Sequence, residues 1–454
     1  MKVVIIGAGE VGYNIANRLS NEDQDVVIVD SDEDKVKKVS EELDVQAIHG
    51  RGSNPEVLEE AGIAGANLFI AVTNIDEINM ISCLMAGMMT GFPLIRIARI
   101  REAGYVKYQQ VFDKEHLGID LVIDPEREVV KDILNLMKVP GATRIVDFAD
   151  GRVKLLGLRV EDGSEIVDKK LKEIGELHPD KKILIASIAR GDTVIIPDGD
   201  EVIKRGDILF PVTLPELIPN IYRVLGKQLH TTKRVMIIGM RKAAVLLAKE
   251  LEKMEISAKI IASDAVKCSE MASCLDKTMV LHGDPTDQRL LREEGIENTD
   301  IFIALSEDEK MNILTSLLAK RMKAKVSIAL VDNVGYIPLV SQIGVDCVVS
   351  ARQSAVKGIL QFIRKGKIIS VTPLGDVAEA MEAVAMETSD IVNKPLRNLN
   401  FPEGAIIGAI IRKDGIEIPN GDTIVNPGDT IIIFSRRDAI KRVEKKVTVK
   451  LEYF

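Results

Sequence analysis

The sequence predicts an α/β protein in which two parallel-sheet lobes alternate with two small, β-rich α+β lobes. Three observations lead to this fold class. Short apolar stretches alternate with amphipathic helical stretches near the start of the chain, long segments of the chain repeat one another, and Gly-Asp turns separate short β-rich runs in the smaller lobes. A steady succession of strand and helix is typical of a parallel sheet with right-handed crossovers.

The duplication appears as a constant register between distant segments. His49–Met80 (HGRGSNPEVLEEAGIAGANLFIAVTNIDEINM) corresponds without gaps to His282–Ile313 (HGDPTDQRLLREEGIENTDIFIALSEDEKMNI). Two further pairs correspond in the same way: Gly118–Pro125 with Gly344–Ala351, and Arg190–Asp207 with Arg412–Asp429. Such self-similarity indicates an architecture built by repetition. We therefore expect four lobes, over residues 1–140, 141–225, 226–368 and 369–454.

The first lobe is predicted to alternate strands and helices. The expected strands are Val3–Ile6, Val26–Val29, Ala47–Ile48, Leu68–Val72, Leu94–Ala98 and Leu121–Ile123, and helices such as Val11–Leu19, Asp34–Leu43 and Glu77–Met89 connect them. A further helix, Glu126–Lys138, has one apolar stripe: Val129, Val130, Ile133, Leu134 and Met137. Such a stripe packs either into the core of this chain or against a partner subunit.

The second lobe, from about Arg144 to Thr213, is predicted to be β-rich. Its expected strands are Val153–Val160, Ile183–Ala189, Thr193–Ile196 and Ile208–Val212, with turns at Asp162-Gly163, Asp198-Gly199 and Gly206-Asp207. Leu214–Lys233 is predicted to be a linker with some helix. The third and fourth lobes repeat this scheme.

Composition excludes several classes of protein. The formal net charge of −9 argues against a nucleic-acid-binding protein, which usually carries a basic surface. No apolar run approaches the ~18 residues that span a bilayer, and a strand pattern already begins at Val3, where a signal peptide would lie. The cysteines are too few for a disulfide framework, and we expect buried thiols in a reducing cytoplasm and no metal site: Cys83, Cys268, Cys274 and Cys347.

The motif GAGEVG at Gly7–Gly12 lies between a predicted strand and a predicted helix. In this context the pattern is typical of a Rossmann-like dinucleotide-binding lobe. Gly7 permits the tight turn, Gly9 lets the backbone approach a diphosphate, and Gly12 lets the helix pack closely on the strand. Asp30 ends the second strand, where its carboxylate accepts hydrogen bonds from ribose hydroxyls and repels the 2′-phosphate of NADP.

Further ligand contacts are expected at the ends of later strands. Arg51 follows the third strand, Thr73-Asn74 follows the fourth, and Arg99 follows the fifth, from where we expect it to reach a phosphate from the side. NAD(H), ATP and ADP all offer a ribose and phosphates, so the pattern admits any of them. The alternative interpretation is a purely structural turn in which Asp30 caps a loop.

The second copy of the glycine motif is degenerate. It is GMRKAA, Gly239–Ala244, in which Arg241 replaces the second glycine and Ala244 replaces the third. Counting along the repeat places Ala262 at the position of Asp30, although a slip of register toward Ser263 and Asp264 stays open. A side chain at the second glycine position obstructs a diphosphate. Arg241 and Lys242 are then either solvated or bind a phosphate by charge.

The sequence indicates a switch more than an enzyme. It contains no HExxH, GxSxG or GxxxxGK[ST] motif, and His49 and His282 both precede a glycine after a strand, as turn residues do. A nucleotide held without a reactive partner acts as an effector that shifts a conformational equilibrium. The alternatives are an NAD-dependent cytosolic oxidoreductase and a structural scaffold that binds no nucleotide.

The order of GAGEVG, Asp30, NPEVLEEAGI, AVTNIDEINM, ARIR and GIDLVIDPE resembles the N-lobe of the regulator-of-potassium-conductance (RCK) family. The β-rich regions containing IPDGDEVIKRGD and IPNGDTIVNPGD resemble its C-lobe, and the resemblance covers essentially the whole chain. It implies a non-catalytic gating subunit, peripheral on the inner face of the membrane, for a potassium channel or transporter of the TrkH type. It also implies a homotetrameric ring responsive to NAD(H) and to ATP or ADP.

The resemblance also assigns residues. The implied nucleotide contacts are Gly7, Ala8, Gly9, Glu10, Val11, Gly12, Asp30, Arg51, Gly52, Thr73, Asn74 and Arg99. Arg51 is the position that departs most from the family pattern, and the matching stretch of the second copy departs at Arg241, Ala244 and Ala262. The C-lobes of the family either bind a small ligand or dimerise, and the sequence does not choose between these roles.

Overall fold

The computed structural model describes residues 1–22, 24–91, 93–102, 104–105, 117–161, 164–177, 183–191, 193–226, 231–333, 335–364, 369–373, 378–387, 389–412 and 414–447. The predicted turn at Asp162-Gly163 lies outside these residues. The chain divides into two compact units, the first formed by Met1–Leu134 with Arg234–Ile363 and the second by Asn135–Lys233 with Arg364–Phe454. Each unit therefore combines corresponding lobes from the two halves of the duplication.

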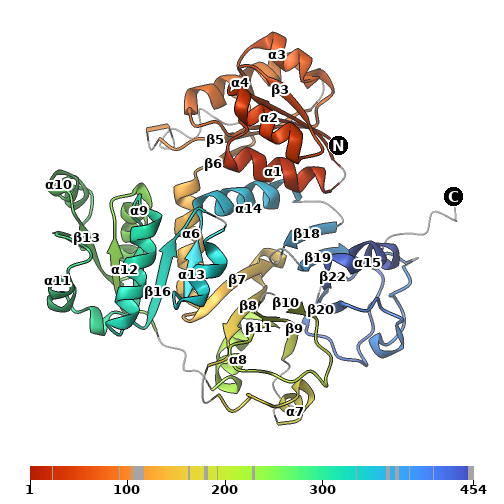
Figure 1. Ribbon diagram of the computed structural model, residues 1–454. Coiled ribbons are helices and arrows are strands. Elements are labelled where there is room, and N and C mark those ends of the chain that lie inside the picture. Colours follow the sequence, from red (N-terminus) through yellow and green to blue (C-terminus); the bar gives the residue numbers. More distant parts are fainter. Residues whose placement is uncertain are drawn as a thin grey trace. The chain divides into compact units, whose positions relative to one another are not determined.

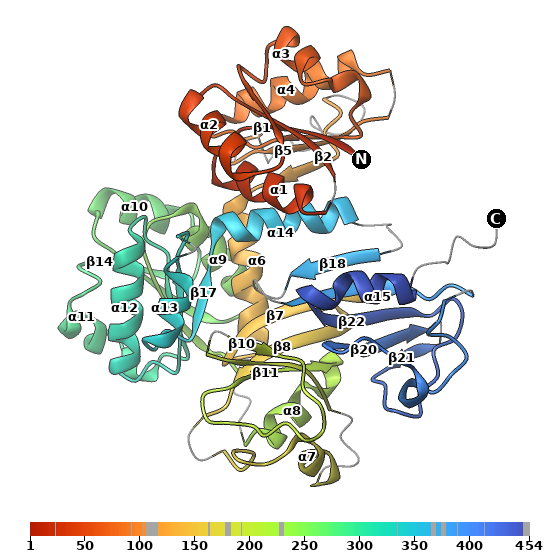
Figure 2. The ribbon, with the colours of Figure 1, turned by 45° about the vertical axis from the view of Figure 1, so that its right-hand side comes forward.

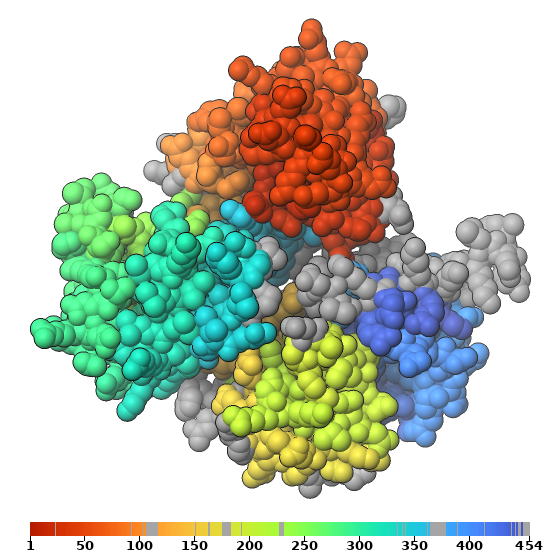
Figure 3. All heavy atoms as spheres, in the orientation of Figure 1, coloured from red at the N-terminus to blue at the C-terminus, as the bar shows by residue number. Residues whose placement is uncertain are grey.

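The first lobe is a six-stranded parallel sheet in the order β3-β2-β1-β4-β5-β6, the doubly wound order of a dinucleotide-binding lobe (Figure 1). Its strands are β1 (Lys2–Ile6), β2 (Asp25–Asp30), β3 (Gln46–His49), β4 (Leu68–Ala71), β5 (Ile95–Arg99) and β6 (Leu121–Ile123). Its helices are α1 (Glu10–Ser20), α2 (Glu33–Glu42), α3 (Pro55–Glu60), α4 (Asp76–Met89) and α6 (Pro125–Lys138). In space-filling view this lobe is the compact body coloured red to orange (Figure 3).

The third lobe, which is the second Rossmann-like lobe and is called the second lobe from here on, repeats this arrangement with the order β14-β13-β12-β15-β16-β17, again all parallel. Its strands are β12 (Arg234–Ile238), β13 (Ser257–Ala262), β14 (Met279–His282), β15 (Ile301–Ala304), β16 (Val326–Leu330) and β17 (Cys347–Val349). Its helices are α9 (Lys242–Lys253), α10 (Ala265–Ser273), α11 (Gln288–Glu293), α12 (Glu309–Arg321), α13 (Ile337–Gln342) and α14 (Ala351–Arg364).

Helix α14 of the second half packs on the first lobe. Its buried residues Ala355 and Ile359 belong to the same apolar cluster as Val11 and Ile15 of α1. Figures 1 and 2 both show α14 lying beside α1. The apolar stripe of α6 is likewise buried in this chain: Val129 and Ile133 are fully buried. The sequence left open whether this stripe packs in the core of the chain or against a partner subunit, and the structure places it in the core.

The two β-rich lobes are antiparallel sheets, in the orders β10-β9-β11-β8-β7 and β18-β19-β22-β20-β21. Their strands are β7 (Ala142–Phe148), β8 (Val153–Arg159), β9 (Leu184–Arg190), β10 (Thr193–Ile195), β11 (Ile208–Thr213), β18 (Ile369–Pro373), β19 (Ala378–Val384), β20 (Ala405–Arg412), β21 (Gly415–Glu417) and β22 (Thr430–Arg436). Their helices are α7 (Leu171–Leu177), α8 (Ile218–Val224) and α15 (Ile440–Val447). Strand β7 was not predicted, and the predicted linker contains α8. The expected fold class is confirmed.

The two β-rich lobes share a core in the second unit. Phe148 of β7 and Phe434 of β22 meet edge to face, with ring centroids 5.8 Å apart. Both belong to one buried apolar cluster that draws residues from both sheets, including Val212 and Ile432. The C-lobes of one chain therefore pack on each other.

The described residues contain no helix long and apolar enough to cross a membrane. Within those same residues, no group of three or more His, Cys, Asp or Glu side chains is arranged to hold a metal ion. Cys83, Cys268 and Cys347 are buried, as expected for apolar thiols, and burial raises the pKa of Cys83 to about 12. The expectation is wrong for Cys274, which is exposed because it ends α10 at the surface.

Candidate functional site

The first glycine turn has the backbone geometry that its sequence predicts. Gly7 adopts φ +103°, a conformation that side chains rarely allow, and its N–H donates to the carbonyl of Val29 at 2.8 Å. A Cβ at Gly12 would lie 1.8 Å from the carbonyl oxygen of Gly7, so only glycine lets α1 pack this closely on the turn. A Cβ at Gly7 would lie 3.0 Å from the Thr73 nitrogen, which places the end of β4 beside the turn.

Gly9 differs from the other two glycines because the space in front of it is open. It has an ordinary φ of −69°, and a Cβ built there meets no atom within 4 Å. It is the N-cap residue of α1, whose first turn receives no side-chain capping bond. The first amides of a helix lack intrahelical acceptors and attract anions. The amino end of α1, with Glu10 exposed beside it, is therefore accessible to a phosphate.

Asp30 supports the turn as well as facing the site. One carboxylate oxygen accepts a hydrogen bond from Ala8 N–H at 2.6 Å, and the other accepts from Asp32 N–H at 2.9 Å. These bonds hold Ala8 beside the end of β2. A carboxylate has further acceptor capacity, so ribose hydroxyls can still bind it. The loop-capping role and the ligand-binding role are compatible in this geometry.

Asn79 is a positioning residue that the sequence analysis missed. Its side chain is fully buried, and its oxygen accepts from the Thr73 N–H at 2.9 Å and from the Thr73 hydroxyl at 2.7 Å. Its amide donates to the carbonyls of Thr73 and Arg99, at 3.1 and 2.8 Å. Asn312 makes the same four kinds of contact, with Ser306 and Leu330. The sequence did contain a signal for this role, because the repeat has an asparagine at both equivalent positions, 79 and 312.

The remaining residues predicted to contact the ligand differ in how deeply they are buried. The Nε of Arg99 is buried without a hydrogen-bond partner, and desolvation, followed by the nearby charge of Arg101, lowers the pKa of its guanidinium. A buried donor of this kind is suited to an anionic ligand. Gly52 is buried against Ile6, where a Cβ would lie 2.0 Å from a methyl group. Arg51 and Asn74 are exposed.

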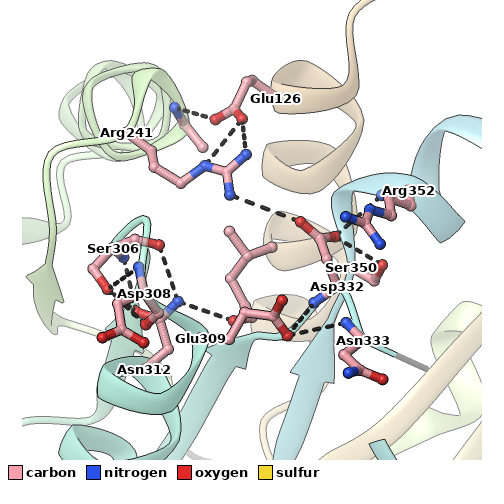
Figure 4. Close-up of polar contacts among 12 residues, drawn as sticks. Glu126, Arg241, Ser306, Asp308, Glu309, Asn312, Asp332, Asn333, Ser350 and Arg352 are labelled. Carbon is pink, nitrogen blue, oxygen red and sulfur yellow. Dashed lines mark hydrogen bonds and ion pairs between the residues drawn. The ribbon is translucent and has the colours of Figure 1, made fainter. Parts of the chain in front are cut away.

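In the second lobe the corresponding turn is closed by side chains. Gly239 keeps the turn conformation, with φ +119°. Arg241, in place of Gly9, directs its guanidinium at the carboxylate of Glu126 from α6, with Nε 3.1 Å and Nη2 2.5 Å from Oε1 (Figure 4). The other oxygen of Glu126 accepts from Ala243 N–H at 3.0 Å. A carboxylate of the chain itself thus occupies the amino end of α9.

Lys242 makes a parallel contact. Its Nζ lies 2.8 Å from the buried carboxylate of Asp124 and also bonds the carbonyl of Arg101. Arg241 lies in addition 3.8 Å from Asp332, which occupies the position of Arg101 in the repeat. The two cations of the degenerate motif therefore face carboxylates of this chain and are not simply solvated.

The structure also resolves the register of the second lobe. Asp264 is the N-cap residue of α10 and accepts from the N–H groups of Val266 and Lys267. Asp32 makes the same contacts at the start of α2. Asp264 thus corresponds to Asp32, and Ala262, which ends β13, corresponds to Asp30. The slip of register is excluded, and the second lobe lacks the ribose-binding carboxylate.

Each histidine of the repeat contacts the chain just after the preceding strand. His49 Nε2 lies 3.1 Å from the carbonyl of Ser31, and His282 Nε2 lies 3.2 Å from the carbonyl of Ser263. The matching contacts support the interpretation of both as turn residues.

Family models match the chain in the alternating order. The TrkA-N domain matches residues 3–125 and 235–351, and the TrkA-C domain matches residues 155–226 and 380–448. Curated relatives match along the whole chain. A Trk system potassium uptake protein TrkA from Azorhizobium caulinodans is 37% identical over 100% of both chains. Another, from Haemophilus influenzae, is 36% identical over 98% of both chains.

Solved structures share the fold. The crystal structure of the GsuK RCK domain is 18% identical, with a TM-score of 0.58, and the match covers 98% of this chain and 94% of that one. A structure of the GsuK channel bound to NAD gives the same identity and TM-score and covers 98% of this chain and 78% of that one. The chain belongs to the family of Trk system potassium uptake proteins TrkA, with tandem RCK domains.

Proposed function

We propose that this protein is the nucleotide-sensing, non-catalytic regulatory subunit of a Trk-type potassium uptake system. The observation that carries the proposal is the difference between its two Rossmann-like lobes. In the first, the amino end of α1 is open at Gly9 and the carboxylate of Asp30 ends β2. In the second, Glu126 and Arg241 fill the corresponding space. One lobe is thus built to bind a nucleotide and the other to bind the rest of its own chain.

The ligand that we propose is NAD(H), with ATP or ADP as alternatives that offer the same ribose and phosphates. The proposed contacts are those named from the sequence, of which Thr73 and Arg99 are held by Asn79. A structurally similar channel, GsuK, has been solved bound to NAD, which supports this ligand class. Differential affinity for two conformations is sufficient for a ligand to act as a switch.

The proposed partner is a membrane potassium channel or transporter of the TrkH type, because the relatives are named as parts of Trk uptake systems. We propose a homotetrameric ring of eight Rossmann-like lobes on the inner face of the membrane. Nucleotide binding in the first lobe shifts the ring between conformations and so changes channel activity. Regulation and not catalysis is proposed because the relatives are named as parts of an uptake system and the sequence contains no HExxH, GxSxG or GxxxxGK[ST] motif.

The test is to measure binding of NADH, ATP and ADP by titration calorimetry, for the wild-type protein and for Asp30→Ala. We expect binding by the wild type and at least roughly ten-fold weaker binding by the variant, the scale of a lost charge-assisted hydrogen bond. In parallel, NADH absorbance is followed with candidate substrates. Turnover would establish the oxidoreductase alternative, and wild-type protein that binds none of the three ligands would refute nucleotide sensing.

A further inference from the structure

We propose that Arg352, on helix α14 of the second half, binds a phosphate of the nucleotide held at the first glycine turn. This inference rests on the proposed function and extends it, because it makes the first-lobe site a composite of both halves of the chain. None of the contacts expected from the sequence includes a residue of the second half.

The duplication relates Arg352 to Glu126. The segment Gly118–Pro125 corresponds to Gly344–Ala351, so Glu126 and Arg352 are the second residues of the corresponding helices α6 and α14. Each helix contacts the Rossmann-like lobe of the other half. Glu126 of α6 bonds Arg241 in the turn before α9, and α14 packs on α1. The two residues thus occupy equivalent positions with opposite charge.

The second lobe shows what this position can reach. The carboxylate of Glu126 accepts a hydrogen bond from Ala243 N–H, in the first turn of α9, at 3.0 Å. Ala243 corresponds to Val11 in the first turn of α1. The amino end of α9 in the second lobe therefore binds an anionic group, the carboxylate of Glu126. The equivalent place in the first lobe is the amino end of α1, where we propose that a phosphate binds.

In the first lobe the same place is approached by a cation. Arg352 Nη1 lies 3.4 Å from a carboxylate oxygen of Glu10, the first residue of α1 and the neighbour of Gly9. The side chain of Arg352 is 39% exposed, so a ligand can reach it. Its backbone is anchored, because Arg352 N–H donates to Asp332 at 3.3 Å and the same oxygen accepts from the Ser350 hydroxyl at 3.0 Å (Figure 4).

The chemistry of this arrangement favours a phosphate. Guanidinium groups bind phosphates through a planar set of donors, and the amides at a helix amino end add to the attraction. The apolar contact of Ala355 and Ile359 with α1 holds α14 in place, so the position of Arg352 is set before the ligand arrives. The contact with Glu10 holds the guanidinium near the amino end of α1, from where it turns to the ligand.

The experiment measures the dissociation constants of ADP and ATP by titration calorimetry on the full-length chain. The variants are Arg352→Ala, Arg352→Lys and the control Lys357→Ala. Lys357 is on the same helix, and its ion pair with Asp132, at 2.8 Å, joins α14 to α6 away from the turn. Arg352→Ala and Lys357→Ala each remove one positive charge and one ion pair from α14.

We expect Arg352→Ala to weaken ADP binding by roughly ten-fold, the scale of one charge-assisted hydrogen bond, and ATP binding by at least as much. Arg352→Lys should recover part of the loss, and Lys357→Ala should bind as the wild type does. Equal affinities for Arg352→Ala and Lys357→Ala would overturn the role of Arg352 while leaving nucleotide sensing intact. Wild-type protein that binds no nucleotide would overturn both proposals.

Discussion

At the scale of single residues, the three glycines of the first turn have different physical roles. Gly7 is required by its positive φ, and Gly12 is required by the contact of α1 with the turn. Gly9 has no such structural requirement, because its φ is ordinary and the space beside it is open. The lack of a side chain at Gly9 instead lets a ligand approach the backbone. Within this motif, Gly7 and Gly12 therefore serve the stability of the fold, and Gly9 serves ligand binding.

We predict that Gly12→Ala lowers the free energy of unfolding by at least about 2 kcal/mol, because its Cβ would lie 1.8 Å from the Gly7 oxygen. Gly9→Ala should leave stability within about 0.5 kcal/mol of the wild type, as substitutions without contacts do. Gly9→Ala should nevertheless weaken nucleotide binding, because a methyl group obstructs the diphosphate. Urea denaturation and titration calorimetry measure the two quantities. Unchanged affinity in Gly9→Ala would contradict the assigned role of Gly9.

At the scale of elements, the β-rich lobes are each held by one arginine at the end of a strand. Arg190, which ends β9, bonds both oxygens of Asp207 at 2.9 and 2.8 Å and contacts Glu201 at 3.0 Å. These partners raise the pKa of Arg190, with the hydrogen bonds that it donates to Asp207 as the largest cause. Arg412 makes the matching bond to Asp429. The shared spacing in the repeat thus reflects a structural ion pair.

We predict that Arg190→Ala destabilises the protein by about 3 kcal/mol, because it leaves the carboxylate of Asp207 buried without its partner. The control is Lys172→Ala, which removes an exposed ion pair with Asp200 and should cost less than about 1 kcal/mol. Thermal and urea unfolding monitored by circular dichroism measure both. Similar small losses in the two variants would show that the Arg190 network is no more important than a surface pair.

The helix α6 contains a carboxylate in an unfavourable environment. Burial raises the pKa of Glu128 above its ordinary value, and the ion pair with Lys131, at 3.6 Å, offsets only part of this effect. A raised pKa in the folded state means that the folded protein holds the proton more tightly than the unfolded chain. The contribution of Glu128 to stability is therefore most favourable at low pH and declines as the pH rises through its folded pKa.

We predict that Glu128→Gln is slightly more stable than the wild type at pH 7, by on the order of 1 kcal/mol or less. The difference should vanish below about pH 4, where the glutamate of the wild type is protonated in both states. Urea denaturation over a range of pH measures it. A variant that is less stable than the wild type at pH 7 would show that the Lys131 pair outweighs desolvation.

At the scale of the whole molecule, the degenerate lobe connects the two halves of the first unit. Glu126 and Arg241 are 14% and 18% exposed, and Asp124, the partner of Lys242, is 3% exposed. Asp124 and Glu126 directly follow β6, which ends the first-lobe sheet. The degenerate turn of the second lobe, which lacks the second and third glycines of a nucleotide site, therefore binds the segment that directly follows the sheet of the first lobe.

We predict strong coupling between Glu126 and Arg241 in a double-mutant cycle of stability. Each single alanine variant should cost about 3 kcal/mol, because it leaves its partner charge buried without its nearest counter-charge. The double variant should cost clearly less than the sum, with a coupling energy of roughly 1–3 kcal/mol. Additive effects would mean that the two side chains do not depend on each other. Urea unfolding of the three variants measures the cycle.

Local features of the sequence determined much of this molecule. The strands of the first Rossmann-like lobe were predicted to within one residue at their ends, because apolar periodicity reports burial along one element. The first glycine turn was predicted because φ and close approach restrict Gly7 and Gly12 themselves. The degeneracy of the second turn was visible for the same reason. Strand β7 was missed, since its apolar residues alternate too weakly to be distinguished from a loop.

Only the tertiary structure decided what meets at the two turns. The pairing of Glu126 with Arg241 joins residues more than a hundred positions apart, as does the approach of Arg352 to Glu10. The support of Thr73 and Arg99 by Asn79 likewise depends on a strand and a helix being packed together. Local patterns report the burial and backbone conformation of one segment. The partner of a buried charge is set by how separate elements pack, and no short stretch of sequence contains that information.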